Sequence, residues 1–222
     1  MGYIDIVNLI TIGRSNVGKT VLIRRFVAEF SGQLWDPTTD GTQPTITNEL
    51  TKLEVTVDKK LVELRFWDTA GQERFNSLSS SFYRNADGVL LCYDITDLDS
   101  FIGLPFYVEQ IKRFCHKDTV VTLLATKCDL TGQRVISQTQ GKQFADMHGF
   151  DFYEVSSYTN SNVANSVVFC MKKILDKVDN GYKLSQSNLK ESQALGEDKN
   201  GRKKGRGKGW RDDDDINFVC PC

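Results

Sequence analysis

The sequence predicts a doubly wound α/β domain with a mostly parallel six-stranded sheet and one antiparallel edge strand. Two observations carry this prediction. Short apolar stretches typical of buried strands alternate with helical stretches along most of the chain. A glycine-framed loop, residues 13–20, stands between the first expected strand and the first expected helix, where such folds bind phosphate groups. The ligand of such a sheet lies at the carboxyl ends of its strands.

The expected elements follow one another in a regular order. The first strand is 4–12 and the first helix is 18–30. Strands 50–57 and 61–67 alternate apolar with polar residues across the short link 58–60, which predicts an antiparallel hairpin. The later strands are 89–93, 120–125 and 152–155, and the later helices are about 73–85, 98–115, 137–148 and 160–178.

Composition divides the chain at about residue 178. Of its 222 residues 40% are hydrophobic, so residues 1–178 can bury a real core, while the net charge of −1 argues neither for nor against nucleic acid. Residues 179–222 are rich in Ser, Gln, Asn, Gly and Lys, which predicts a flexible tail. No apolar run approaches the ~20 residues of a membrane helix, and the first six residues lack the basic region of a secretory signal.

Residues 13–20 read Gly-Arg-Ser-Asn-Val-Gly-Lys-Thr and match the G-x-x-x-x-G-K-[ST] pattern of a phosphate-binding loop. Two glycines let the backbone curl so that successive N–H groups point inward, and the following helix N-terminus adds positive potential. Lys19 is expected to reach the β- and γ-phosphates, and the Thr20 hydroxyl to bind Mg²⁺. The alternative is an ordinary turn with a solvated lysine. The predicted phosphate-binding residues are Gly13, Ser15, Asn16, Val17, Gly18, Lys19 and Thr20.

A second motif begins where strand 61–67 ends. A carboxylate at this place, Asp68, can hold Mg²⁺ through water beside a phosphate loop. Gly71 lets its own N–H approach a γ-phosphate closely, and Gln72 is placed to orient an attacking water. The alternative is a strand end followed by a charged helix start.

With these residues the chain resembles the Ras superfamily, and within it the Rab branch. The resemblance covers residues 4 to about 178 and is carried by the stretches 67–75, 79–86 and 93–97. It implies a P-loop NTPase of the small G domain type, which binds GTP or GDP with Mg²⁺. It also implies that Gln72 is the catalytic residue and that hydrolysis is slow without an activating protein.

The stretch from Thr126 to Asp129 resembles the guanine motif of this family. The resemblance implies that the Asp129 carboxylate accepts both N–H groups of the guanine edge, while the Lys127 stem lies along the base. Adenine offers no matching pair of donors, so this carboxylate selects GTP over ATP. The family usually has Asn where this chain has Thr126, which leaves guanine selectivity intact but makes affinity less secure. A surface Lys-x-Asp in an ordinary loop is the alternative.

Two further base contacts are implied by position. Ser156 and Ser157 fall where the family carries its Ser-Ala-Lys loop, whose backbone N–H after the first serine bonds guanine O6. Tyr158 replaces the lysine of that loop, so one favourable contact near the base is lost. An aromatic ring should also stack on the purine, with Phe30 as the first choice and Trp35 as the alternative.

The first switch needs a threonine that binds Mg²⁺ through its hydroxyl and the γ-phosphate through its N–H. Counting forward from Thr20 favours Thr38, whereas counting back from Asp68 favours Thr45. The loop therefore carries an insertion. We expect Thr45, because the next residues lead straight into the second strand. The predicted metal ligands are Thr20, Thr45 and Asp68.

The Rab branch presents an aromatic triad to its effectors, and in this chain the triad would be Leu50, Trp67 and Phe82. One aromatic has become aliphatic, so the choice of effector does not carry over. Plain core packing is the alternative for Trp67 and Phe82.

The chain ends in Cys220-Pro221-Cys222, which resembles the Cys-x-Cys end that Rab proteins use for double geranylgeranylation. Two lipid chains anchor a protein stably, whereas one does so marginally. The basic run 199–211 favours an anionic membrane, although a nucleic-acid contact is the alternative, and the acidic block 212–215 argues for the membrane. The other four cysteines stand singly among apolar residues, as reduced thiols of a cytosolic protein do: Cys92, Cys115, Cys128 and Cys170.

Two functions are compatible with these features. The first is a Rab-like GTPase that acts as a switch in vesicle trafficking, with an exchange factor, an activating protein, effectors, and prenylation and escort proteins as partners and no nucleic acid. It would reside on the cytoplasmic face of an intracellular membrane, with a cytosolic pool. The second is a membrane-anchored module that holds nucleotide but barely hydrolyses it, which the departures at Asn16, Thr126 and Tyr158 favour and Gln72 opposes.

Overall fold

The computed structural model describes residues 5–36, 49–68 and 79–185, all of which belong to one compact unit that spans residues 1–188. Six residues with a predicted role lie outside the described part of the chain. They are Thr38, Thr45, Gly71, Gln72, Cys220 and Cys222.

The sheet has six strands in the order β2-β3-β1-β4-β5-β6. β2 and β3 pair antiparallel as a hairpin at one edge, and every other pair of neighbouring strands is parallel. The predicted doubly wound architecture with one antiparallel edge strand is therefore confirmed. The strands are β1 (Asp5–Ile12), β2 (Glu49–Val57), β3 (Lys60–Asp68), β4 (Gly88–Asp94), β5 (Val120–Thr126) and β6 (Asp151–Glu154).

The helices follow the predicted order with one interruption. The stretch expected as a single helix over 98–115 forms two helices that meet at Gly103, because Pro105 in the first turn of the second helix has no N–H to continue the ladder. Asp97 caps the first of the two by accepting from the backbone N–H groups of Asp99 and Ser100. The helices are α1 (Lys19–Ser31), α2 (Ser79–Arg84), α3 (Leu98–Ile102), α4 (Leu104–Phe114), α5 (Gln138–His148) and α6 (Val163–Asp179), with a 3₁₀ turn at Thr131–Gln133.

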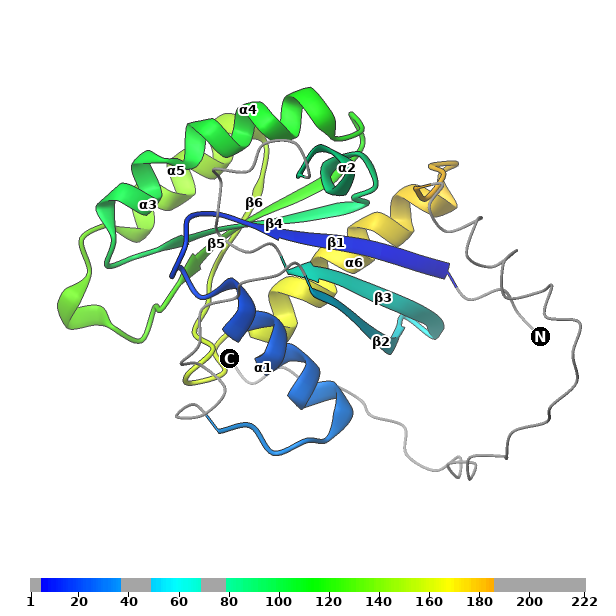
Figure 1. Cartoon of the computed structure of the whole chain (residues 1–222), viewed down its shortest axis with the longest axis horizontal. Coiled ribbons are helices and arrows are strands. Elements are labelled where there is room, and N and C mark those ends of the chain that lie inside the picture. Colours follow the sequence, from blue (N-terminus) through cyan, green and yellow to red (C-terminus); the bar gives the residue numbers. More distant parts are fainter. Residues whose placement is uncertain (1–4, 37–48, 69–78, 186–222) are drawn as a thin grey trace, which may run out of the picture. The chain divides into compact units, whose positions relative to one another are not determined.

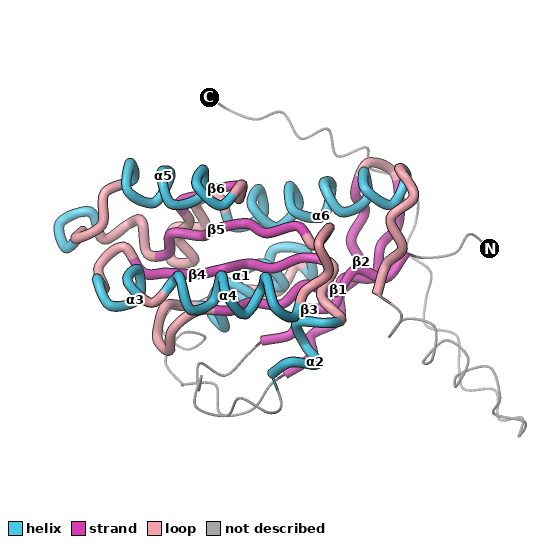
Figure 2. The backbone as a smooth tube through the Cα atoms, turned by 90° about the horizontal axis from the view of Figure 1, so that it is seen from above, coloured by secondary structure: helices cyan, strands magenta, loops and turns pink. Residues whose placement is uncertain are grey.

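Two apolar clusters cover the two faces of the sheet. Figure 1 shows α1 and α6 on one side and α3, α4 and α5 on the other, and Figure 2 shows β1, β4 and β5 side by side between them. Side chains alternate along β1, so Leu9 packs in the cluster of α1 and α6 whereas Ile10 packs in the cluster of α4 and α5. The central strands β1, β4 and β5 are thus buried on both faces, as their apolar sequences predict, whereas β2 exposes the polar side chains of one face.

The carboxyl ends of four parallel strands lie together at one end of this sheet. β1 leads into the phosphate loop, β3 ends at Asp68, β4 ends at Asp94 and β5 ends at Thr126. Because these strands are parallel, the motifs that follow them along the chain are brought together in space.

The described chain continues past the boundary expected at residue 178. Helix α6 ends at Asp179, and residues 180–185 turn back onto the domain through hydrogen bonds to β1 and to the residue before β4. The folded unit therefore includes a short segment that composition assigned to the tail.

Candidate functional site

The phosphate loop has a backbone that only particular residues can adopt. Gly13 has φ +140°, and a Cβ on it would lie 2.2 Å from the carbonyl oxygen of Cys92 on β4. Gly18 has φ +92° at the start of α1, and Asn16 has φ +66°. Asn tolerates this left-handed conformation better than most residues. The backbone of residues 13–18 thus turns sharply at three positions, and Asn16 occupies one of them.

Lys19 is held inside the loop that it is expected to serve. Its ammonium Nζ donates hydrogen bonds of 2.8 Å to the carbonyl oxygens of Gly13 and of Arg14. The side chain is buried although it is charged. Backbone carbonyls thus fix the position of a cation at the rim of the loop, where an anionic phosphate would be stabilised.

Thr20 and Asp68 bring oxygen ligands together at the same edge. The Thr20 hydroxyl, in the first turn of α1, donates a 2.6 Å hydrogen bond to Oδ2 of Asp68 at the end of β3. Hydroxyl and carboxylate oxygens are the donors that Mg²⁺ prefers, so these two residues fit the metal expected of them. The third predicted ligand, Thr45, lies outside the described residues.

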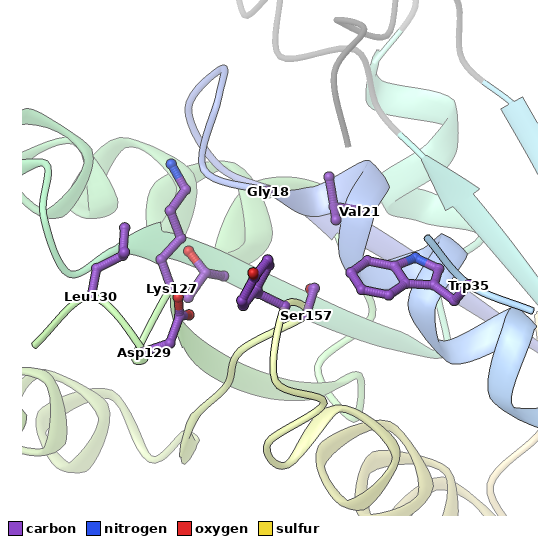
Figure 3. Close-up of a pocket in the computed structure, with 9 residues that line it drawn as sticks. Gly18, Val21, Trp35, Lys127, Asp129, Leu130 and Ser157 are labelled. Atoms are coloured by element: carbon purple, nitrogen blue, oxygen red, sulfur yellow. The ribbon is translucent and has the colours of Figure 1, made fainter. Parts of the chain in front are cut away.

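A pocket of about 310 Å³ lies beside the loop, and its volume is in the range of small-molecule sites. Figure 3 shows the indole of Trp35 on one side of it and Lys127 and Asp129 on the other, with Ser157 between them. Residues from four separate parts of the chain line it: Gly18, Val21, Trp35, Thr126, Lys127, Asp129, Leu130, Ser157 and Tyr158.

Asp129, the predicted guanine-binding carboxylate, is positioned by Ser156. The Ser156 hydroxyl donates a 2.5 Å hydrogen bond to Oδ1 of Asp129 and accepts one of 3.1 Å from the N–H of Thr159. Ser156 is completely buried. Its neighbour Ser157 lines the pocket, where the sequence places a backbone donor for the base. The two motifs therefore meet at one wall of the pocket.

Thr126 connects the pocket to the phosphate loop. Its buried hydroxyl lies 2.7 Å from the carbonyl oxygen of Val17 in the loop and 2.9 Å from that of Tyr93 in β4. Thr126 therefore links the phosphate loop to the end of β4 through one side chain.

Lys127 is held by a residue that the sequence did not single out. It has φ +59°, and its Nζ lies 2.6 Å from Oδ2 of Asp94, which is buried at the end of β4. Arg14 of the phosphate loop likewise lies 2.9 Å from Asp99 at the start of α3. Asp94 could have been predicted as a site residue, because it is an acid at the carboxyl end of a buried parallel strand.

The structure distinguishes the two candidates for the stacking aromatic. Trp35 lines the pocket, and the guanidinium carbon of Arg25 lies 4.6 Å from its ring centroid. Phe30 packs instead against Phe26 within α1, at a centroid distance of 4.5 Å, and is not among the lining residues. Trp35 follows the end of α1 at Ser31, so the chain just after this helix brings an aromatic ring to the pocket.

The three residues of the predicted effector surface form one continuous patch. Leu50 on β2 stands directly opposite Trp67 on β3, so their side chains share a face. The ring of Trp67 lies 5.2 Å from that of Phe82 on α2. All three are partly exposed, so core packing accounts for only part of their surface.

The four internal cysteines are free thiols. Burial raises the pKa of Cys92, of Cys115 and of Cys170 to about 12, so these thiols are neutral at physiological pH. Across residues 5–36, 49–68 and 79–185, no helix combines the length and apolar character that crossing a membrane requires.

Comparisons with known proteins place these features in a family. A model of the Ras family matches residues 8–176. The chain is 35% identical over 191 residues to the GTP-binding protein YPT1 of Saccharomyces cerevisiae, an alignment that covers 86% of each chain. The matched range includes the phosphate loop, Asp68 and the pocket.

Proposed function

This chain belongs to the Ras family as a Rab-like small GTPase, and from that premise we propose that it is a membrane-anchored switch in intracellular vesicle trafficking. In the GTP-bound form it would recruit effectors, and hydrolysis to GDP would release them. The single observation that carries the proposal is the pocket in which the phosphate loop, Asp129 and Ser157 converge.

Guanine selection in this proposal depends on Asp129. Its carboxylate borders the pocket and is oriented by Ser156, so it is preorganised to accept two N–H groups from one base edge. Adenine has no such pair of donors on that edge. Trp35 would stack on the purine from the side of the pocket opposite Asp129. The Arg25 guanidinium, whose carbon lies 4.6 Å from the ring centroid of Trp35, would hold the indole in place.

Hydrolysis would use residues of the phosphate loop together with residues that follow β3. Lys19 would neutralise charge that develops on the β- and γ-phosphates, and Gly71 would donate its N–H to the γ-phosphate. Gln72 would orient the attacking water. Thr20, Asp68 and Thr45 would hold Mg²⁺, which when bound withdraws charge from the phosphate oxygens.

Membrane attachment in this proposal depends on the C-terminal residues. Cys220 and Cys222 would carry two prenyl chains, and the basic run 199–211 would add attraction to an anionic cytoplasmic leaflet. Prenylation and escort proteins would handle this end of the chain. The patch of Leu50, Trp67 and Phe82 would contact effectors, while an exchange factor and an activating protein would set the rate of the cycle.

A second candidate differs in rate. The chain would hold GTP at the membrane and hydrolyse it so slowly that binding is its working activity. The replaced residues Thr126 and Tyr158 and the lengthened loop after α1 favour this candidate, since each changes the surroundings of the nucleotide.

One experiment tests both candidates. The unlipidated full chain is purified, its bound nucleotide is identified, and the loss of GTP is timed in wild type and in Gln72→Leu. A switch shows bound guanine nucleotide and a wild-type rate that falls at least tenfold in the variant. Equal persistence of GTP in both proteins favours the second candidate. A preparation that binds no guanine nucleotide contradicts both.

The first-switch threonine is tested separately. Thr45→Ala is expected to abolish GTP-dependent binding of an effector, whereas Thr38→Ala is expected to leave it intact. The reverse result would assign the role to Thr38. Both variants are compared by pull-down with the same effector, in the presence of GTP and of GDP.

A further inference from the structure

A further buried carboxylate, Asp87, lies at the end of the sheet away from the pocket. Asp87 immediately precedes β4, so it lies at the amino end of that strand, and no part of its surface reaches solvent. The backbone of Asp87 is hydrogen-bonded on both sides: its N–H donates to the carbonyl of Asn8, and its carbonyl accepts from the N–H of Val120. Nothing in the nucleotide site touches it, so its charge needs another explanation.

Donors from two distant parts of the chain surround this carboxylate. Oδ2 accepts from the backbone N–H of Asn8 at 2.9 Å and from the Asn8 side-chain amide at 3.3 Å. Oδ1 accepts from the backbone N–H of Ser185 at 2.9 Å and from the Tyr182 hydroxyl at 3.5 Å. Asn8 lies on β1, whereas Tyr182 and Ser185 follow the last helix.

Residues 181–185, which we call the strap, are tied down at further points. The N–H of Tyr182 donates to the carbonyl of Lys177 in α6, and the Tyr182 ring lies 5.7 Å from that of His116. The hydroxyl of Ser185 accepts a 2.9 Å hydrogen bond from the Asn8 side chain. Leu184 packs against the apolar cluster on the α1 and α6 side of the sheet. Figure 1 shows the end of α6 at the same end of the sheet as the start of β1.

We propose that Asp87 clamps the strap onto the amino end of the sheet and so fixes the path of the chain after α6 as far as Ser185. Opening the strap would take the Tyr182 and Ser185 donors away from the Asp87 carboxylate. Leaving a buried carboxylate without hydrogen-bond donors costs free energy, and this cost opposes the opening. The nucleotide pocket lies at the opposite, carboxyl end of the same strands. The clamp stands on its own contacts and does not depend on the lipid attachment proposed above.

Trypsin cleavage of the full chain tests the clamp, because the strap contains Lys183. The rate of cleavage after Lys183 is followed by mass spectrometry with GDP present, and cleavage after Lys190 serves as the reference for protease activity. In Asp87→Asn one carboxylate oxygen becomes an amide that faces N–H donors. Cleavage after Lys183, relative to Lys190, is expected to rise at least tenfold.

Two internal checks make the result specific. Arg65 is buried in β3, so cleavage after it reports opening of the whole domain and is expected to stay at the wild-type rate. Asp176→Asn makes the same chemical change at an exposed acid of α6 and is expected to leave every rate unchanged. If Lys183 and Arg65 become cleavable together, the strap has no clamp of its own and the proposal is wrong.

A variant on the other side of the contact covers the case in which Asp87→Asn does not fold. Ser185→Pro removes the N–H that donates to Asp87 and leaves the acid in place. It should raise cleavage after Lys183 severalfold with GDP binding unchanged. Wild-type cleavage in both variants would overturn the clamp. Failure of the wild-type chain to bind GDP would instead count against the proposed function, since no contact of the clamp involves nucleotide.

Discussion

The two ends of the central sheet each hold a buried or half-buried aspartate, and they use it differently. At the carboxyl end, Asp129 is oriented by Ser156 and borders an open pocket of about 310 Å³. At the amino end, both oxygens of Asp87 are filled by donors from β1 and the strap, and the residue is wholly enclosed. Burial of an acid therefore does not mark a binding site. What matters is whether the protein itself supplies all of the donors.

This difference follows from topology. In a doubly wound sheet the loops after the strands diverge at the carboxyl ends and leave space for a ligand. Here the amino ends are closed, because the chain after α6 returns to them and seals Asp87. Substitutions at the carboxyl end should alter nucleotide affinity, and substitutions at the amino end should alter stability.

The largest effect is expected for Lys19→Ala at the carboxyl end. Affinity for GDP should fall roughly 30- to 3,000-fold, since truncating one partner of a buried charge pair costs about 2–5 kcal/mol and a factor of ten is about 1.4 kcal/mol. Titration with a fluorescent GDP analogue measures the change. Lys142→Ala, which removes an exposed lysine of α5, is the control and should leave affinity unchanged. Equal affinity in both variants would contradict the assignment of the phosphate loop.

The next largest effect is expected for Asp87→Ala at the amino end. The free energy of unfolding should fall by about 2–4 kcal/mol, because each buried donor left unsatisfied costs about 1–3 kcal/mol and loss of the buried charge offsets part of this. Urea denaturation measures the fall, and GDP affinity is measured on the same protein. A large loss of affinity without a loss of stability would break the comparison between the two ends.

A matched pair of threonines separates the ends more finely. Thr126→Val removes the hydroxyl that lies against the carbonyl of Val17 in the phosphate loop. Thr119→Val removes a hydroxyl at the amino end of the sheet, which donates a 3.2 Å hydrogen bond to the carbonyl of Ala86. Each loses about 1 kcal/mol, the usual net value of such a hydrogen bond. Only Thr126→Val should speed GDP release, roughly fivefold by stopped-flow fluorescence. Identical release rates in the two variants would show that Thr126 does not act on the loop.

The smallest effect concerns pH. Burial raises the pKa of Asp87 above its ordinary value of 3.8, and the hydrogen bonds from Asn8 and Ser185 oppose that rise without cancelling it. A raised folded-state pKa means that this group's contribution to stability is fully present below pH 3.8 and is lost as pH rises through the folded-state pKa. The stability advantage of wild type over Asp87→Asn should therefore shrink as pH rises from 3.8. Urea denaturation of both proteins across that range measures it, and an advantage that grows with pH would contradict the direction.

Local patterns predicted much of the site, because its chemistry is encoded in short stretches. The phosphate loop needs glycines at particular backbone conformations. At Gly13 a Cβ would lie 2.2 Å from the carbonyl oxygen of Cys92, so a side chain does not fit there. The hairpin of β2 and β3 and the order of the helices also follow from local periodicity. Asp68 was predicted as a ligand because it stands at the end of an apolar strand, whereas Asp129 was predicted because residues 126–129 resemble the guanine motif of the family.

The sequence by itself determined the fold class and predicted the phosphate loop and the acids of the proposed site, since each prediction depends on residues that are neighbours in the chain. Tertiary structure alone decided that Trp35 rather than Phe30 reaches the pocket, because this depends on the direction in which α1 ends and on the path of the few residues after it. It also decided that Thr126 holds the loop and that the strap closes on Asp87. Those contacts join residues about 100 positions apart, and no local pattern specifies which distant donors a buried oxygen will find.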